Sequence, residues 1–127
     1  MEKKINILIA DDEDLIRRAL SRVFLAKGHK VFSAENGVRA LEFLNSEKID
    51  IIILDLLMPE KNGFDVLAEM KSVIPVVVIS AFSGTHADHF HSGEYPQVVG
   101  FIKKPFEHLN IVTEQIEKLY ANYIWKI

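Results

Sequence analysis

The chain has 127 residues, which is enough for one compact domain but not for two. Its 15 basic and 18 acidic residues give a net charge of -3, so it lacks the basic surplus that holds nucleic acid through phosphate contacts, and we expect no direct nucleic-acid binding. The absence of cysteine excludes disulfides, thiolate nucleophiles and zinc-cysteine sites.

The amino end does not have the pattern of a signal peptide. Residues 1–4 are charged and lead directly into a short apolar strand, without a longer apolar region and a small-residue cleavage site. No apolar run approaches the length of a membrane span. We therefore expect a cytoplasmic protein without membrane insertion, formed by one domain over residues 1–127.

Short apolar segments alternate with helical patterns along the chain. The first predicted strand, residues 5–10, is followed by a helix whose apolar residues recur at three- and four-residue steps. We expect Asp12 or Asp14 to cap this helix and Gly28 to end it in a left-handed conformation. The later elements are strands at 31–34, 49–54, 76–79 and 98–102, and helices at 38–45, at 64–71 and from 109 to 123.

The helical pattern weakens between residues 81 and 97. Gly84, Gly93 and Pro96 interrupt it, so we expect the fourth helix to be short or irregular. Strand alternating with helix five times is typical of an α/β fold, in which helices cover both faces of a parallel sheet. The alternation predicts a single doubly wound domain but leaves the strand order open.

The third predicted strand ends at an acid. Residues 51–54 are apolar and three of them are β-branched, which suits a strand buried on both faces. Pro59 and Asn62 indicate a loop after it, so Asp55 should lie in the crevice at the carboxyl edge of the sheet, where open α/β sheets bind ligands. The simpler interpretation is that Asp55 only begins a turn.

Polar residues close the other strands as well. Asp11 and Asp12 would share a pocket with Asp55 if the first and third strands were neighbours, and a hard cation such as Mg²⁺ relieves the repulsion among three carboxylates. Ser80 and Lys104 add a hydroxyl and an ammonium group at the same edge. Together these groups suit a phosphoryl anion beside a metal, with an aspartate as nucleophile. Taken singly, they could be helix caps, a turn serine and a solvated lysine.

The joint spacing of these residues resembles the receiver domain of two-component response regulators. The resemblance covers the whole chain and rests on four motifs, namely Asp11-Asp12, Asp55 in Asp-Leu-Leu-Met-Pro-Glu-Lys-Asn-Gly, Ser80-Ala81 and Lys104-Pro105-Phe106. It implies a flavodoxin-like five-stranded sheet with the order 2-1-3-4-5. Asp55 is then the expected phosphoacceptor, and Ser80 and Lys104 are expected to contact the phosphoryl group. The expected Mg²⁺ ligands are Asp11, Asp12, Asp55 and the backbone carbonyl of Leu57.

The resemblance also assigns roles around the lysine. Phe101 stands where the family has an aromatic residue that reorients on phosphorylation, although static packing is the alternative. The bond between Lys104 and Pro105 is cis in similar domains. Lys103 competes with Lys104 for the pocket, but successive strand residues face opposite sides, and adjacency to the proline favours Lys104.

Two apolar residues flank the expected phosphoryl position. Phe82 lies two residues after Ser80, and Leu57 lies two residues after Asp55. Such positions influence hydrolysis in the family, and apolar side chains there would obstruct an attacking water. We therefore expect a long-lived acyl phosphate.

The histidine-containing segment 86–91 and the carboxyl-terminal tail each have more than one interpretation. The spacing of three histidines matches no well-defined metal motif, so a solvated loop is favoured over a transition-metal site at His86, His89 and His91. The tail, residues 120–127, is more apolar than one helix face needs. Three interpretations of this tail stay open: it completes the core, it contacts a partner, or it begins a linker.

The main functional prediction is a switch that accepts a phosphoryl group from a phosphohistidine on a sensor kinase or histidine phosphotransfer domain, using Mg²⁺. It would catalyse only its own phosphoryl transfer and dephosphorylation, and it could dimerise through the face of its fourth helix, fifth strand and last helix or through the tail. A Mg²⁺-dependent phosphohydrolase is the alternative, although Leu57 occupies the place of its second acid. A third possibility is a receiver-like module that binds partners without phosphorylation. A dinucleotide site is disfavoured because Asp11 and Asp12 stand where a glycine-rich loop would be needed.

Overall fold

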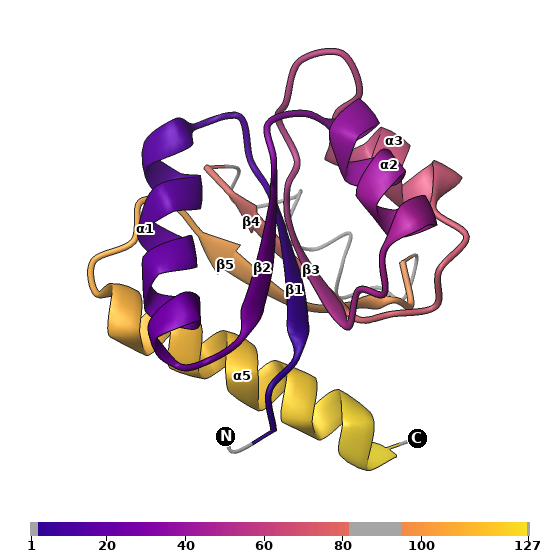
Figure 1. The fold of residues 1–127 in the computed structure, drawn as a ribbon. Helices are drawn as coiled ribbons and strands as arrows, with labels where there is room; N and C mark the ends of the chain where they lie inside the picture. Colours follow the sequence, from indigo (N-terminus) through magenta and orange to yellow (C-terminus); the bar gives the residue numbers. More distant parts are fainter. Residues whose placement is uncertain (1–2, 82–94, 127) are drawn as a thin grey trace.

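The computed structural model describes residues 3–81 and 95–126. Strands and helices alternate through these ranges, and Figure 1 shows one sheet between two layers of helices. The strands are β1 Asn6–Ala10, β2 Lys30–Ala34, β3 Ile51–Asp55, β4 Val76–Ser80 and β5 Val98–Lys103. The helices are α1 Asp14–Ala26, α2 Gly37–Ser46, α3 Gly63–Glu69 and α5 Leu109–Lys126.

The five strands form a parallel sheet in the order β2-β1-β3-β4-β5. This confirms the predicted α/β fold and strand order. The order reverses between β1 and β3, so the connections leaving these two strands run to opposite faces and open a crevice at their carboxyl ends. The polar residues at, or directly after, the carboxyl ends of β1, β3, β4 and β5 therefore meet at one edge.

Each face of the sheet has its own core because side chains alternate along a strand. One face packs against α1 and α5, and the other packs against α2 and α3 (Figure 1). In β3, Ile51 and Ile53 face α1 and α5, while Ile52 and Leu54 face α2 and α3, and all four are fully buried. This two-sided burial explains the continuous apolar run before Asp55.

Of the two predictions about the ends of α1, the one for its start is wrong and the one for its end is confirmed. Its N-cap is Glu13, which makes no side-chain capping bond, so neither Asp12 nor Asp14 caps the helix. The Asp14 carboxylate instead pairs with arginines of its own helix. Gly28 has φ of 91° and follows the C-cap in a Schellman motif, in which its N–H donates to the carbonyl of Leu25 at 2.9 Å, confirming the predicted left-handed end.

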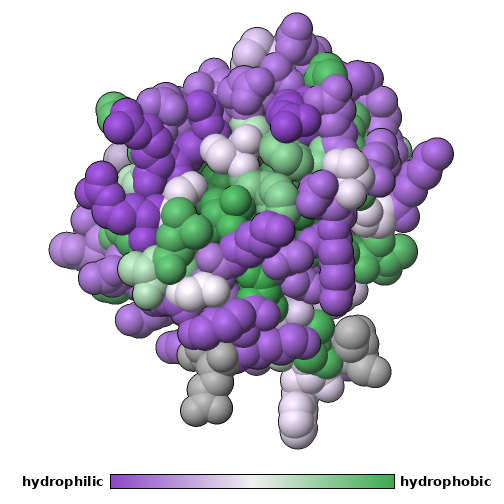
Figure 2. Space-filling view, in the orientation of Figure 1, coloured by the Kyte–Doolittle hydropathy of each residue, from purple (hydrophilic) through white to green (hydrophobic). Residues whose placement is uncertain are grey.

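The carboxyl-terminal helix continues past the sheet (Figure 1). Tyr120 is buried in the core, as one interpretation of the tail required, while Trp125 is 89% exposed. The face of the molecule in Figure 2 is largely hydrophilic, with apolar atoms gathered near the middle of the view, over the edge strand β2. None of the described helices is long and apolar enough to cross a membrane.

Several sequence predictions lie outside the described residues. These are the fourth helix, the possible metal ligands His86, His89 and His91, and the hydrolysis-tuning residue Phe82. Ile127, at the end of the tail, is also outside them.

Candidate functional site

Four polar residues meet at the carboxyl edge of the sheet. Asp11 directly follows β1, Asp55 ends β3, Ser80 ends β4, and Lys104 directly follows β5. Because β1 pairs with β3, β3 with β4 and β4 with β5, the strand order brings the predicted residues to one place. All four are buried, with at most 9% of each residue exposed.

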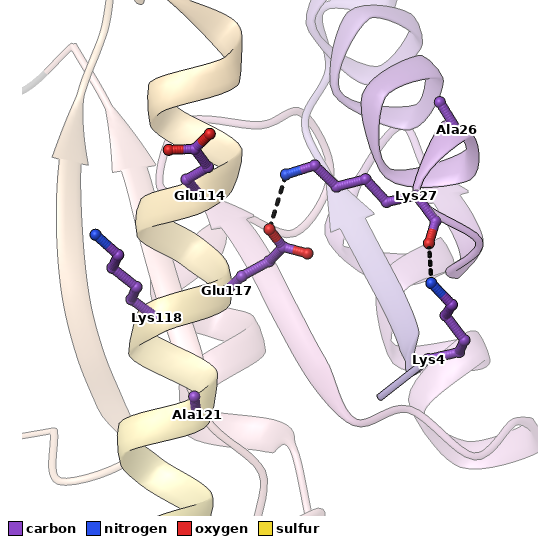
Figure 3. Close-up of a pocket in the computed structure, with 7 residues that line it drawn as sticks. All are labelled: Lys4, Ala26, Lys27, Glu114, Glu117, Lys118 and Ala121. Carbon is purple, nitrogen blue, oxygen red and sulfur yellow. Dashed lines mark hydrogen bonds and ion pairs between the residues drawn. The ribbon is translucent and has the colours of Figure 1, made fainter. Parts of the chain in front are cut away.

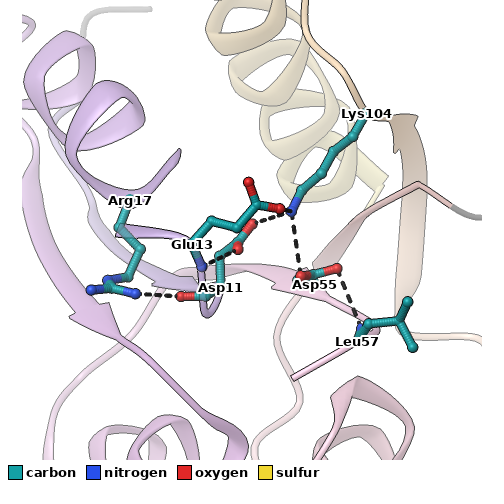
Figure 4. A network of polar contacts seen from close by, with 6 residues as sticks. All are labelled: Asp11, Glu13, Arg17, Asp55, Leu57 and Lys104. Carbon is teal, nitrogen blue, oxygen red and sulfur yellow. Dashed lines mark hydrogen bonds and ion pairs between the residues drawn. The ribbon is translucent and has the colours of Figure 1, made fainter. Parts of the chain in front are cut away.

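The ammonium group of Lys104 links the carboxylates of this site (Figure 4). Its Nζ lies 2.7 Å from Oδ2 of Asp11, 3.0 Å from Oε1 of Glu13 and 3.3 Å from Oδ2 of Asp55. The Asp11 contact is an ion pair that lacks the alignment of a hydrogen bond. Lys104 therefore compensates two buried negative charges and one at the rim, since 57% of the Glu13 side chain is exposed.

Of two adjacent lysines, Lys104 and not Lys103 reaches the pocket, as predicted. Lys103 is exposed, whereas Lys104 is buried and reaches Asp55. The backbone N–H of Lys104 donates to the carbonyl of Ser80 at 2.8 Å, which holds the end of β5 beside β4. The peptide bond from Lys104 to Pro105 is cis, as expected.

Burial makes the two central carboxyl groups harder to ionise. Desolvation, with the nearby Asp11 charge second, raises the pKa of Asp55 to about 6. Desolvation also raises the pKa of Asp11. Burial alone would lower the pKa of Lys104, but its contacts with Asp11 and Glu13 outweigh burial and raise it, so the ammonium form is stabilised. The site thus contains anions that remain incompletely compensated.

The acidic residues fit a Mg²⁺ ion. Asp11, Asp12 and Asp55 each offer a carboxylate oxygen, and these oxygens lie within 4.8 Å of one another. Oδ2 of Asp11 is buried and accepts no hydrogen bond from the described residues, while Asp12 is exposed, which leaves room for water. Carboxylate oxygens open to water on one side are the ligand set that Mg²⁺ prefers.

Two hydrogen bonds hold the loop after β3 in place. The N–H of Leu57 donates to Oδ1 of Asp55 at 3.3 Å, while Leu57 itself is 52% exposed and its side chain points away from the carboxylate (Figure 4). Gly63, at the start of α3, donates its N–H to the carbonyl of Leu56 at 3.0 Å. A Cβ at Gly63 would lie 2.5 Å from the carbonyl oxygen of Asp55, so only glycine permits this close packing.

Two residues of the site were not predicted. Glu13 pairs with Lys104, and Arg17 donates from Nη1 to the carbonyl oxygen of Asp11 at 2.7 Å (Figure 4). The sequence offered a weak signal for them, because Glu13 lies in the acidic run after β1 and Arg17 follows Asp14 by three residues on a helix. Which groups such side chains contact depends on how the loop between β1 and α1 lies relative to the residue that follows β5, which periodicity does not describe.

Phe101 lies on β5 and is half buried against the core that also contains α2 and α3. Its position is compatible with either predicted role, a switch or static packing.

A hollow of about 770 Å³, whose lining includes none of the acidic cluster, lies between the carboxyl end of α1 and α5 (Figure 3). The charged groups around it contact one another. Lys27 Nζ lies 2.8 Å from Oε1 of Glu117, and Lys4 Nζ donates to the carbonyl of Lys27 at 2.5 Å. Buried His29 accepts from the N–H of Ile5 at Nδ1, so Nε2 donates to Oε2 of Glu117 at 2.9 Å. These contacts join α1 to α5, and we assign them a structural role.

Comparison with known proteins points to one family. The family model of the response regulator receiver domain matches residues 7–116. Sporulation initiation phosphotransferase F of Bacillus subtilis is 32% identical over 115 residues, which are 88% of this chain and 90% of that protein. Response regulator RR06 of Streptococcus pneumoniae is 34% identical over 129 residues, and the match covers 96% of this chain but 58% of that protein.

Solved structures agree with this. The response regulator protein TrrA of Thermotoga maritima, in complex with Mg²⁺-BeF, has a TM-score of 0.74 and 29% identity, covering 92% of this chain and 99% of that one. A receiver domain protein from Methanospirillum hungatei has a TM-score of 0.83 over 98% of this chain and 100% of that one, with 16% identity, and so supports the fold alone.

Proposed function

The chain belongs to the response regulator receiver domain family, a family of two-component phosphorylation switches, and on this basis we propose that Asp55 is its phosphoacceptor. The observation that carries the proposal is the position of Asp55, buried at the end of β3 with Lys104 Nζ 3.3 Å from its Oδ2. Such a domain is a signalling switch rather than a metabolic enzyme.

In the proposed reaction, a carboxylate oxygen of Asp55 attacks the phosphorus of a phosphohistidine on a partner. The new bond is O–P, the P–N bond breaks, and its electron pair stays on the imidazole nitrogen. Burial is the main cause that raises the pKa of Asp55 to about 6, so a fraction of this carboxyl group is protonated near neutral pH and does not react. Lys104 is placed to draw Asp55 toward the charged form.

We assign the metal site to Asp11, Asp12, Asp55 and the backbone carbonyl of Leu57. Bound Mg²⁺ would offset the carboxylate charge and that of the phosphoryl group. Lys104 would donate to the phosphoryl oxygens, as would the hydroxyl of Ser80. This assignment is supported by the three aspartates, which each offer a carboxylate oxygen within 4.8 Å of the other two.

The output of the switch follows from population shift. A phosphoryl group on Asp55 adds negative charge at the end of β3, beside β4, and it favours the conformations in which Ser80 and Lys104 close on it. Phe101 lies on β5, three residues before Lys104, and would repack in that state. The proposed signal therefore travels along β5, on the face of the sheet that packs against α2 and α3.

The partner is proposed to be a sensor histidine kinase or a histidine phosphotransfer domain, in keeping with the two-component family. Residues 1–127 would form the whole receiver domain. The chain spans 58% of RR06 and 26% of the regulatory protein AtoC of Escherichia coli. Dimerisation would use the face of β5 and α5, or the tail with exposed Trp125.

Hydrolysis of the acyl phosphate is proposed to be slow. Leu57 is half exposed two residues after Asp55, and its apolar side chain offers no group that could orient an attacking water. Autodephosphorylation would then depend on Leu57 and Phe82, and polar substitutions there should shorten the lifetime of the phosphorylated form.

One experiment tests the function. The protein is incubated with a small phosphodonor and Mg²⁺, and intact mass is measured for the wild type and for Asp55→Asn. A stable gain of one phosphoryl group in the wild type alone supports the proposal. Rapid donor turnover without accumulation would favour a phosphohydrolase, and no reaction would favour a module that binds partners without phosphorylation.

A further inference from the structure

We infer that Glu13 is a positioning residue that competes with the phosphoryl group for Lys104. This inference rests on the proposed phosphorylation of Asp55 and adds a regulatory contact to it. Glu13 matches none of the motifs on which the site was predicted, and only the structure shows its contact with Lys104 across the carboxyl edge of the sheet.

The geometry places Glu13 as an alternative partner for the lysine. Its Oε1 lies 3.0 Å from Nζ of Lys104, which is closer than Oδ2 of Asp55 at 3.3 Å. The backbone N–H of Glu13 donates to Oδ1 of Asp11 at 2.8 Å, so a residue of the site holds the backbone of Glu13 in place. The Glu13 side chain stands at the rim with 57% of its surface exposed, while Lys104 is 9% exposed.

The contact opposes phosphorylation for two reasons. An ammonium group has three donor hydrogens, and a donor directed at Glu13 is not directed at a phosphoryl oxygen. A carboxylate that stays beside Lys104 also repels the doubly charged phosphoryl group. Glu13 therefore stabilises the unphosphorylated arrangement more than the phosphorylated one, and only such a differential contact shifts the population of a switch.

Removing this carboxylate tests the competition. Glu13→Gln keeps the shape of the side chain and removes its charge, whereas Asp14→Asn removes the same charge one residue along the chain. Asp14 is a matched control because its carboxylate pairs with Arg17 at 3.0 Å and Arg18 at 3.3 Å instead. Glu13→Asp keeps the charge but withdraws it by one methylene.

The functional readout is the affinity for beryllofluoride, a phosphoryl mimic, measured by calorimetry at saturating Mg²⁺. Saturation with the metal removes the direct effect of the lost charge on cation binding. We expect Glu13→Gln to bind the mimic about fivefold more tightly than the wild type, as for one partly exposed ion pair. Asp14→Asn should stay within about twofold of the wild type, and Glu13→Asp should lie between wild type and Glu13→Gln. Equal or weaker binding by Glu13→Gln would overturn the inference.

A spectroscopic readout tests the contact itself. The side-chain nitrogen resonance of Lys104, observed without ligands, should move in Glu13→Gln and stay in place in Asp14→Asn. An unmoved resonance in Glu13→Gln would also overturn the inference. If the wild type is phosphorylated on Asp55 but Glu13→Gln behaves like Asp14→Asn, this inference alone fails. If the wild type gains no phosphoryl group, the proposed function fails.

Discussion

The Nζ atom of Lys104 lies 3.3 Å from Oδ2 of Asp55, so one ammonium group partly neutralises the carboxylate that is proposed to take up phosphate. The same ammonium is 2.7 Å from Oδ2 of Asp11. A cation bound to these carboxylates would be repelled by the ammonium group of Lys104, which already contacts both of them. Lys104 and Mg²⁺ are therefore competitors in the unphosphorylated protein, although both would favour the phosphorylated one.

Replacing this lysine should have opposite effects on stability and on metal binding. Lys104→Met leaves Asp11 and Asp55 without their buried counter-ion, and we expect it to lower the free energy of unfolding by about 3 kcal/mol without Mg²⁺. Because the competing ammonium is gone, Mg²⁺ should bind about tenfold more tightly. Urea denaturation and metal titration measure the two effects.

The adjacent lysine provides the control. Lys103 is exposed, so Lys103→Met should change stability by no more than about 0.5 kcal/mol and leave the Mg²⁺ affinity unchanged. Weaker Mg²⁺ binding by Lys104→Met would contradict the competition.

The raised pKa of Asp55 predicts a dependence of stability on pH. Its carboxyl group, shifted by burial from 3.8 to about 6, binds a proton more tightly in the folded than in the unfolded state. This group therefore favours folding more at pH 4 than at pH 7, and its destabilising effect grows as the pH rises through this window, to about 3 kcal/mol. Asp55→Asn should be more stable than the wild type at pH 7.5 without metal.

Urea denaturation between pH 4.5 and 7.5 measures this difference. The gap between Asp55→Asn and the wild type should widen as the pH rises. A gap that does not change with pH would show that Asp55 is not difficult to ionise in the folded protein.

Loss of the exposed metal ligand should separate metal binding from folding. Asp12 is exposed, so Asp12→Asn should leave the metal-free melting temperature almost unchanged. Wild-type protein at a Mg²⁺ concentration 100-fold above its Kd should gain about 2.7 kcal/mol of stability, and Asp12→Asn should lose most of this gain at the same concentration. Asp14→Asn, with the same charge change nearby, should keep it. Thermal melts with and without Mg²⁺ give the comparison.

The contacts between α1 and α5 should stabilise the fold without affecting the site. Glu117→Gln weakens the links to Lys27 and His29 and should cost about 1 to 3 kcal/mol at pH 7. Burial alone would raise the pKa of Glu117, but these two partners lower it, so the stabilisation is present above about pH 4.5 and is lost as the pH falls below that value.

Glu114 is the matched control for this effect. It lines the same hollow on α5 but is exposed, so Glu114→Gln should change stability by no more than about 0.5 kcal/mol. Both variants should bind Mg²⁺ like the wild type. A change in Mg²⁺ affinity in Glu117→Gln would contradict the structural role assigned to the hollow.

Local patterns were enough to locate the strand ends. The apolar run at 51–54 predicted a strand buried on both faces, and it is one, because a central parallel strand leaves no face to water. The prediction that Asp12 or Asp14 caps α1 was wrong, because the N-cap is Glu13, whose side chain makes no capping bond and whose backbone N–H donates to the side chain of Asp11. That bond depends on how the acidic run leaves the sheet, which residue preferences at helix ends do not encode.

The sequence by itself determined the alternation of strands and helices, and with it the placement of Asp11, Asp55, Ser80 and Lys104 at strand ends, because periodicity is set by residues close together in the chain. The tertiary structure decided which of these side chains contact one another. The pairing of Glu13 with Lys104 joins residues that are 91 positions apart, and that of His29 with Glu117 spans 88 positions. Such contacts depend on how packed elements orient their side chains, and no local pattern carries that information.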